Sequence, residues 1–337
     1  MSAQTTGPEA VLQIAAGTRR AKVLFVAVEL GFFAELAGKP LDAEQLGTRL
    51  GLHPQGCRDL LLALLAMGLL EKGAAGYHNA PVADAYLVPG RPGYLGGFLR
   101  FLDKVLHEAW QGLEHSVRTG EPHNADADAG DPYEPMYENG SDRTGFLDAM
   151  DVLSGSIGAQ LSQLDWSRWH SFVDVGGARG NLAAQIVKAN RHLTATVFDL
   201  PELEPACAAH LTELGMHDLV TFQPGDFFVD PLPAADVVIF GHVLHNWPEQ
   251  RRRDLLAKAF AAVRPGGAVL VYDPMIDERR PQLANVLASL NMLVWSAGGA
   301  EYPVGDARGW MLDAGFGAVT ARRLGPTSTL LVGHRDA

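Results

Sequence analysis

Apolar residues recur along the first part of this chain with a helical period. From Ala10 to Leu36 they predict one or two helices with a broad apolar face. A further helix is predicted over 41–50, opened by Asp42, and another runs from Pro54 to Leu70. The stretch 71–78 has a glycine-rich centre, which predicts a small β-hairpin. The order helix, helix, hairpin is that of a winged helix.

The middle of the chain is also predicted to be helical. Residues 92–118 carry a long aromatic and aliphatic stripe at helical spacing, and residues 133–164 continue the helical pattern. Core packing is the simplest interpretation of the stripe, and part of it could also wall a pocket. From residue 172 the pattern changes, because short apolar runs typical of buried strands now alternate with helical segments.

This alternation predicts a parallel, doubly wound sheet. The strands are expected at 172–175, 194–198, 220–222, 235–240 and 268–272, with a helix over 249–263 ended by Arg-Pro-Gly-Gly and a closing β-hairpin at 316–322 and 327–332. The expected fold class is therefore α/β. A Rossmann-like doubly wound domain with a terminal hairpin follows a mainly α winged-helix domain.

Composition and charge exclude several classes of partner. The chain has 337 residues, 47% of them hydrophobic and 20% charged, which is ample material for two globular domains. Its net charge of -12 argues against nucleic acid or an anionic membrane as the main partner. Neither a signal-peptide pattern nor an apolar run of membrane-spanning length occurs, and the two cysteines form no redox or metal pattern. We expect a cytoplasmic protein that binds no metal.

The predicted winged helix requires a choice between DNA binding and dimerisation. Its candidate recognition segment, 53–67, is mostly apolar and carries a single basic residue, Arg58. A helix this apolar suits burial against a partner better than contact with phosphates. We therefore predict that the N-terminal domain forms a homodimer.

The segment Ser171–Pro201 has the pattern of a nucleotide-cofactor site. A buried strand is followed directly by Gly176, Gly177 and Gly180, and then by a helix whose free N–H groups face whatever lies over the turn. The next strand ends at Asp199, about 20 residues beyond the turn, where an acid can hold ribose hydroxyls.

The acid before the glycines indicates which cofactor binds. A dinucleotide fingerprint spaces its glycines G-x-G-x-x-G, whereas this chain has DVGGARG with Asp174 two residues before the first glycine. A carboxylate there would repel a pyrophosphate, but it suits a cationic amino-acid group. The pattern favours S-adenosyl-L-methionine over NAD, with a brace of the turn as the alternative role of Asp174.

Six segments in this order resemble the class I S-adenosylmethionine-dependent small-molecule O-methyltransferases of the caffeate and hydroxyindole type. They are DVGGARG, the acid of VFDLP, GDFF at Gly225 to Phe228, HVLHNWP, RPGG, and GGAEY followed by AGF. The resemblance covers nearly the whole chain. It implies an N-terminal dimerisation domain, S-adenosyl-L-methionine as methyl donor with S-adenosyl-L-homocysteine as product, and methylation of an aromatic hydroxyl in natural-product biosynthesis.

The resemblance also assigns roles to individual residues. It places the cofactor among Asp174, Gly176, Gly177, Gly180, Asp199, Leu200, Gly225, Asp226, Phe227 and Gly241. It makes His245 the general base, Glu301 the acid that orients it and Asp273 a second acid. It places the substrate against Met150, His242, Asn246, Met292 and Trp295.

Three positions depart from the family pattern, and other readings stay open. Asn246 replaces a usual Asp, Ala178 replaces a common Gly, and Gly241 stands where plant members have a lysine. His245 could instead bond within its own loop, and Met292 and Trp295 could be core residues. Alternative functions are N- or C-methylation, a non-methylating reaction that keeps the cofactor, or a ligand-sensing winged-helix regulator.

The sequence thus predicts three parts with different tasks. Residues 1–95 form the dimerisation domain, 96–165 a helical connector that contributes to the substrate pocket, and 166–337 the methyltransferase domain.

Overall fold

The computed structural model describes residues 7–123 and 140–337, which form two compact units. The first unit comprises the described residues of Met1–Val105 together with Thr144–Val152, and the second those of Leu106–Arg143 and Leu153–Ala337. The predicted division into residues 1–95, 96–165 and 166–337 has other boundaries than these two units, and it stays a prediction. No helix within the described ranges is long and apolar enough to cross a membrane.

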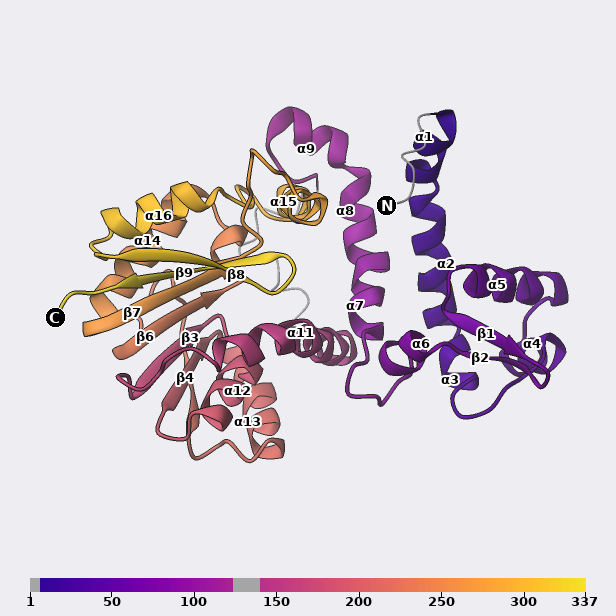
Figure 1. Cartoon of the computed structure of the whole chain (residues 1–337), viewed down its shortest axis with the longest axis horizontal. Helices are drawn as coiled ribbons and strands as arrows, with labels where there is room; N and C mark the ends of the chain where they lie inside the picture. Colours follow the sequence, from indigo (N-terminus) through magenta and orange to yellow (C-terminus); the bar gives the residue numbers. More distant parts are fainter. Residues whose placement is uncertain (1–6, 124–139) are drawn as a thin grey trace. The chain divides into compact units, whose positions relative to one another are not determined.

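The first unit has the helix, helix, hairpin order expected from the sequence (Figure 1). Its elements are α1 (Pro8–Ala15), α2 (Gly17–Glu29), α3 (Phe32–Glu35), α4 (Ala43–Leu50), α5 (Pro54–Ala66), β1 (Leu70–Gly73), β2 (Gly76–Asn79), α6 (Pro81–Tyr86) and α7 (Gly96–Phe101). Asp42 opens α4 as predicted, because its carboxylate accepts the N–H of Gln45 while the Gln45 side chain accepts the N–H of Asp42. Phe32, Leu46 and Leu61 are fully buried in the core of this unit.

A nearly continuous helical stretch leads out of this unit. It runs through a π-helical segment (Leu102–Leu106), α8 (His107–Gln111) and α9 (Leu113–Thr119). The helix predicted over 133–164 is present as α11 (Gly140–Leu161), and residues 133–139 lie outside the described residues.

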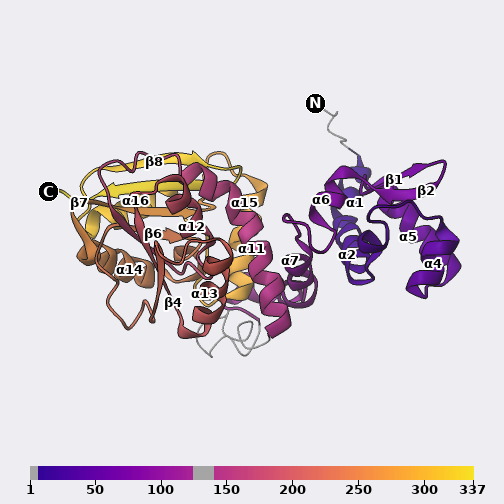
Figure 2. The ribbon, with the colours of Figure 1, turned by 90° about the horizontal axis from the view of Figure 1, so that it is seen from below.

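The second unit is built on a seven-stranded sheet within the described residues. Its strands are β3 (Ser171–Val175), β4 (Thr194–Asp199), β5 (Val220–Pro224), β6 (Ala235–Gly241), β7 (Val263–Asp273), β8 (Val319–Leu324) and β9 (Ser328–His334). Their spatial order is β5-β4-β3-β6-β7-β9-β8, so the terminal hairpin lies at the far edge from β5. In Figure 2, β8 and β4 lie on opposite sides of this unit. The first five strands are parallel, and β9 pairs antiparallel with both β7 and β8.

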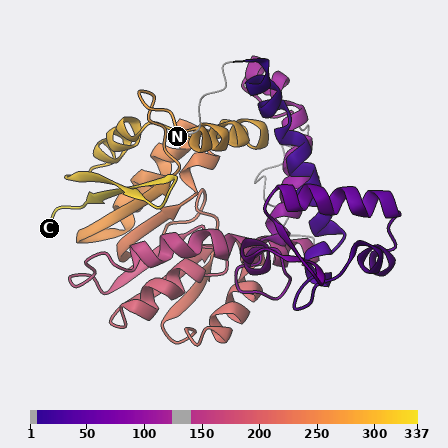
Figure 3. The ribbon, with the colours of Figure 1, turned by 45° about the vertical axis from the view of Figure 1, so that its right-hand side comes forward.

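Helices cover both faces of this sheet, as the continuous apolar character of its strands predicts (Figure 3). On one face lie α12 (Asn181–Ala189), α13 (Glu204–Glu213) and the end of α11; on the other lie α14 (Glu249–Ala262) and α16 (Val304–Asp313). Neighbouring strand residues alternate between the faces, so Phe172 packs on the first set and Val173 on the second. The predicted doubly wound fold with a terminal hairpin is thereby confirmed.

Several boundaries differ from the sequence prediction. The helix that begins at Pro54 ends at Ala66 and not at Leu70, because Leu70 begins β1. The Arg-Pro-Gly-Gly segment does not separate α14 from its strand, because β7 already begins at Val263, which pairs with Ala235 across an irregular register. The first strand of the hairpin begins at Val319 rather than 316, since Phe316 is buried in the core beneath α16.

The strand order places ligand chemistry at one position on the sheet edge. The chain moves outward from β3 to β4 and β5, then returns to place β6 on the other side of β3. At such a switch point the loops leave β3 and β6 in opposite directions and open a crevice at the carboxyl ends of the strands. The glycine turn follows β3, and the segment with His242 and His245 follows β6.

Candidate active site

The glycine turn after β3 packs closely against the Asp174 side chain. An added Cβ on Gly177 would lie 2.7 Å from Oδ2 of Asp174, so only glycine allows this carboxylate to lie against the turn. Ala178 adopts a positive φ of 48°, a conformation that costs a residue with a side chain about 1–2 kcal/mol. The Ala178 N–H donates to Oδ2 of Asp199 at 2.8 Å, and this charge-assisted bond offsets that strain.

Asp174 has the features of a receptor for a cationic group. Its side chain is 3% exposed, and its Oδ2 has no hydrogen-bond partner among the described residues. Burial, together with the neighbouring charge of Asp199, raises the pKa of Asp174 to about 7. A buried carboxylate oxygen without a donor is stabilised when an ammonium group binds to it, which fits the amino-acid end of S-adenosyl-L-methionine.

Most of the other residues predicted to hold the cofactor lie at the end of β4 or on the segments that follow β4 and β5, and Gly241 ends β6. Oδ1 of Asp199 accepts the N–H of Leu200 at 2.8 Å, so this acid is braced on both sides. Gly225 donates its N–H to the Asp199 carbonyl, which ties the two loops together. Asp226 accepts the N–H of Phe228, and the Phe227 ring packs edge-on against Phe228 at 4.7 Å.

Lys258 holds the loop after β5, which carries Asp226 and Phe227, through hydrogen bonds to its backbone. Its ammonium group, on α14, donates to the carbonyls of Phe227, Phe228 and Asp230 at 2.8, 2.8 and 2.9 Å. Three charge-assisted hydrogen bonds converge on one cation, so the loop is held firmly where the cofactor is predicted to bind.

The tertiary structure brings His245 and Glu301 together, although 56 residues separate them. Nδ1 of His245 lies 2.6 Å from Oε1 of Glu301 and 3.7 Å from Oδ1 of Asp273. His245 lies in the short 3₁₀ turn Leu244–Asn246, Glu301 follows α15 (Leu283–Trp295), and Asp273 ends β7. All three side chains are buried, at 7%, 5% and 0% exposure. Because the carboxylate occupies Nδ1, the opposite ring nitrogen, Nε2, is left to accept a proton.

The two acids control the protonation of this imidazole. Burial lowers the pKa of His245, but the charges of Asp273 and Glu301 and the hydrogen bond to Glu301 outweigh that effect and raise the pKa to about 9. Burial raises the pKa of Asp273, whose other oxygen accepts a short hydrogen bond from the Tyr302 hydroxyl. The arrangement strongly stabilises the imidazolium, as an orienting acid does in a catalytic triad.

His242 belongs to the same cluster, but its pKa is shifted in the opposite direction to that of His245. Burial and the nearby His245 lower the pKa of His242 to about 3, so this ring is neutral at neutral pH. Ligand atoms of His242, His245 and Asp273 lie within 4.8 Å of one another, so a cation there would compete with a proton for His245. That no metal binds stays a prediction.

The backbone at His242 is strained and braced. Its φ of 55° is unusual for a non-glycine residue, and such strain is found near functional sites. The N–H of His242 donates to Tyr272 at 3.0 Å, and the Asn246 amide donates to the His242 carbonyl at 3.1 Å. An aspartate could not donate this second bond, which gives the departure at Asn246 a structural reason. Its role in substrate binding stays a prediction.

The departure at Gly241 also has a structural reason. A Cβ on Gly241 would lie 2.1 Å from the hydroxyl oxygen of Tyr272, so the tyrosine ring fills the space of a side chain at 241. Tyr272 is 3% exposed and packs edge-on against His242, with ring centroids 5.3 Å apart. Tyr272 of the neighbouring strand therefore occupies the space that a larger residue at 241 would need.

Two of the predicted substrate walls lie on α15. Met292 and Trp295 are close to its end, and Trp110 of α8 donates to Asn291 of the same helix at 2.5 Å. Trp110, a residue of the aromatic stripe, thus contacts α15. Most of the stripe is half-buried, and Val117 is exposed. Met150 lies on the part of α11 that belongs to the first unit. The roles of these side chains against the substrate stay predictions.

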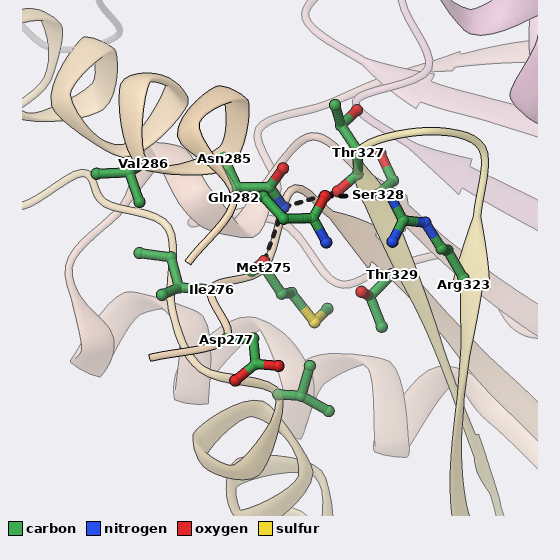
Figure 4. A pocket seen from close by; sticks show the side chains of 11 residues that line it. Met275, Ile276, Asp277, Gln282, Asn285, Val286, Arg323, Thr327, Ser328 and Thr329 are labelled. Carbon is green, nitrogen blue, oxygen red and sulfur yellow. Dashed lines mark hydrogen bonds between the residues drawn. The ribbon is translucent and has the colours of Figure 1, made fainter. Parts of the chain in front are cut away.

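A cavity of about 240 Å³ lies elsewhere in the second unit, and it contains none of the predicted site residues (Figure 4). It opens between the start of α15, the segment after β7 and the β8–β9 hairpin, with Asn285, Arg323 and Thr327 among its lining residues. The Asn285 amide donates to the carbonyls of Met275 and Thr327, both at 2.8 Å. These bonds join the hairpin to the segment that follows Asp273.

Sequence reasoning missed Arg252, Tyr302, Lys258 and Tyr272, which all contact the predicted site residues or their loops. Arg252 stands between exposed Arg251 and half-exposed Arg253, and nothing in that run of the sequence distinguishes it. Only Tyr302 had a local signal, because it directly follows Glu301 in GGAEY.

Comparisons with known proteins identify the family of this chain. Residues 110–317 match the O-methyltransferase domain, and residues 12–89 match the O-methyltransferase dimerisation domain. The tetracenomycin polyketide synthesis 8-O-methyl transferase TcmO of Streptomyces glaucescens is 45% identical over 98% of this chain and 97% of its own length. The N,N-dimethyltransferase OxyT of Streptomyces rimosus is 38% identical, over 93% of this chain and 92% of its own length. The structure of human N-acetylserotonin methyltransferase in complex with S-adenosylmethionine superimposes with a TM-score of 0.89, at 28% identity and full coverage of both chains.

Proposed function

Since the chain belongs to the O-methyltransferase family, we propose that it transfers a methyl group from S-adenosyl-L-methionine to a phenolic hydroxyl of an aromatic small molecule. The similarity to TcmO, whose name specifies a polyketide, supports a role in natural-product biosynthesis. The similarity to the structure with bound S-adenosylmethionine supports the donor. The observation that carries the proposal is the buried His245–Glu301 pair at the switch point where the glycine turn also lies.

His245 acts as the general base of this reaction. A phenol with a pKa near 10 is almost wholly protonated at neutral pH, so it becomes a good nucleophile when a positioned base takes its proton. Nε2 of the neutral His245 imidazole takes that proton, and Glu301 holds Nδ1 and stabilises the imidazolium that results. With a pKa of about 9, the neutral form of His245 is the minor one at pH 7, and its share grows as pH rises. Asp273 adds a second negative charge 3.7 Å away, and Tyr302 fixes its orientation.

The glycine turn holds the donor. When bound, S-adenosyl-L-methionine supplies an electrophilic methyl carbon on a positively charged sulfur. Asp174 binds the ammonium of its amino-acid end, Asp199 and Leu200 hold the ribose and adenine, and Asp226 with Phe227 contacts the adenine. The unpartnered oxygen of Asp174 supports this assignment. Alignment of oxygen and methyl carbon within one site can contribute about 7–11 kcal/mol to lowering the barrier.

The proposal also covers the assembly of the protein and a cytoplasmic location. We propose a homodimer formed through residues 12–89, because this segment matches the family's dimerisation domain. Leu12 and Ile14 of α1 are apolar and exposed, and a partner copy would remove them from water. Cys57 and Cys207 are buried free thiols, which suits the reducing cytoplasm.

The test of the base is the substitution His245→Ala. We expect turnover of a polycyclic phenol to fall by about 10²–10⁴, while calorimetry shows unchanged binding of S-adenosyl-L-methionine. His217→Ala is the matched control, because His217 is exposed on the surface of the same unit. Turnover of the His245 variant within twofold of the parent would overturn the assignment.

N-methylation is the second candidate, because OxyT is an N,N-dimethyltransferase. Mass spectrometry and NMR of the methylated product separate the two reactions when the acceptor carries both an amino and a hydroxyl group. Methyl carbon bonded to nitrogen would overturn the proposal of O-methylation.

A further inference from the structure

Arg252 of α14 is a buried cation whose hydrogen bonds all go to backbone carbonyls. Its side chain is 4% exposed. Nε donates to the carbonyls of Leu244 and Trp247 at 3.1 and 2.6 Å, and Nη2 donates to the carbonyl of Ala300 at 2.8 Å. The guanidinium therefore ties together two loops that lie far apart in the sequence.

These three carbonyls flank the proposed base and its acid. Leu244 directly precedes His245, and Ala300 directly precedes Glu301. A backbone hydrogen bond from Ala300 to the His245 carbonyl, 2.9 Å long, joins the same two loops. Because a planar guanidinium donates in fixed directions, it sets the spacing of the loops and not only their attraction.

Arg252 also supports the second acid of the cluster. Its guanidinium lies over the Tyr302 ring, 4.7 Å from the centroid, and the Tyr302 hydroxyl donates to Asp273. One side chain thus touches the segments of His245 and Glu301, and it reaches Asp273 through Tyr302. No ion pair ties Arg252 to a single acid among the described residues, so its charge acts on the cluster as a whole.

A buried arginine is costly for stability alone. Removal of its charge from water costs several kcal/mol, and an apolar side chain of similar length would fill the same space without that cost. The hydrogen bonds to the two loops offset the cost. On this geometry, which rests on the proposed function of His245, we infer that Arg252 is a positioning residue that holds the His245 imidazole and the Glu301 carboxylate at proton-transfer geometry.

The substitution Arg252→Met removes the three bonds and keeps an unbranched apolar stem in place of the arginine methylenes. A displacement of about 1 Å at a reacting group can cost about 10²-fold in rate. We expect kcat to fall by about that factor, with the KM values of both substrates within about threefold of the parent. Arg253→Met is the matched control, because Arg253 is the next residue on α14 and pairs at the surface with Glu249 and Asp313. Its guanidinium lies 5.9 Å from the centroid of the Trp310 ring, and within the described residues it donates to no carbonyl of the two loops; its kcat should not change.

A double-mutant cycle with His245→Ala separates positioning from a general structural effect. If Arg252 acts through His245, then Arg252→Met in the His245→Ala background should reduce the residual rate no further. A further hundredfold loss in that background, or an unchanged kcat in the single variant, would overturn the inference. If His245→Ala itself has full activity, the proposed base is wrong, and this result is distinct from a failure at Arg252 alone.

Arg252→Lys keeps the test decisive if the methionine variant does not fold. Lysine retains the charge but cannot place two nitrogens along the fixed directions of a guanidinium. We expect about a tenfold loss of kcat with native circular dichroism, and again no further loss in the His245→Ala background. Full activity of this variant at native stability would contradict a role for the guanidinium geometry.

Discussion

The binding of S-adenosyl-L-methionine should depend on pH through Asp174. This carboxylate has a pKa of about 7 in the cofactor-free protein, because it is buried beside Asp199. Only its ionised form attracts the ammonium of the cofactor, so binding must also release the proton. With a pKa of about 7, the dissociation constant should fall about 15-fold, or by about 1.6 kcal/mol, between pH 5.5 and 7.0.

The variant Asp174→Asn removes the charge but keeps the shape. Its affinity should be about 10–100-fold weaker than the parent at pH 7.0, because a charge-assisted hydrogen bond is lost, and it should not vary between pH 5.5 and 7.0. Isothermal titration calorimetry with S-adenosyl-L-homocysteine, which has the same ammonium, measures both quantities. A flat profile in the parent, or the same slope in the variant, would refute the reasoning.

The same substitution should change stability in the opposite direction. The pKa of Asp174 is raised from its ordinary value of 3.8 to about 7, so the folded protein binds more protons than the unfolded chain between these values. The contribution of this group to the free energy of unfolding is therefore lost as pH rises through 7. Without cofactor, Asp174→Asn should be more stable than the parent at pH 8, by up to a few kcal/mol in urea unfolding.

Two further predictions concern the acid beside the base and the loop beneath the cofactor. In the parent, kcat/KM should rise with pH until His245 is deprotonated, near its pKa of about 9. The substitution Glu301→Gln removes one of the negative charges that raise this pKa, so the midpoint of the rise should move to lower pH. The plateau of kcat/KM should fall by about 10². If initial rates measured from pH 6 to 10 give the same midpoint for Glu301→Gln and the parent, Glu301 does not raise the pKa of His245. Lys258→Met should raise the KM for S-adenosyl-L-methionine by about tenfold and leave kcat within about threefold, because it frees the loop of Phe227 and not the base. Equal losses in kcat and in affinity would show that Lys258 has a different role.

Much of this protein could be predicted from local patterns. The doubly wound sheet follows from short apolar runs that alternate with helices, since such runs are stable only when both faces are covered. The capping residue Asp42 and the glycine turn after β3 are also local features, because each depends on contacts within a few residues. The position of Asp174, two residues before the first glycine of the turn, is also a local feature, and it indicated which cofactor binds.

Contacts between distant segments could not be read in this way. Arg251, Arg252 and Arg253 are identical in type and consecutive, yet Arg252 alone among them is buried, while Arg253 is at the surface and Arg251 stacks on Phe228. The tyrosine that fills the space beside Gly241 comes from the neighbouring strand. The sequence therefore showed only that a larger side chain is missing at position 241, and the strand pairing showed which residue takes its space.

The sequence by itself determined the order of the elements, the glycine turn and the kind of chemical group available after each strand, because these depend on neighbours along the chain. The tertiary structure decided which of those groups meet. Parallel pairing of β3, β6 and β7 brings the carboxyl ends of three strands to one edge, where Asp174, His245 and Asp273 gather and Glu301 joins them from 56 residues beyond His245. Burial at that edge then sets their charges, since desolvation depends on everything packed around a group and not on its place in the sequence.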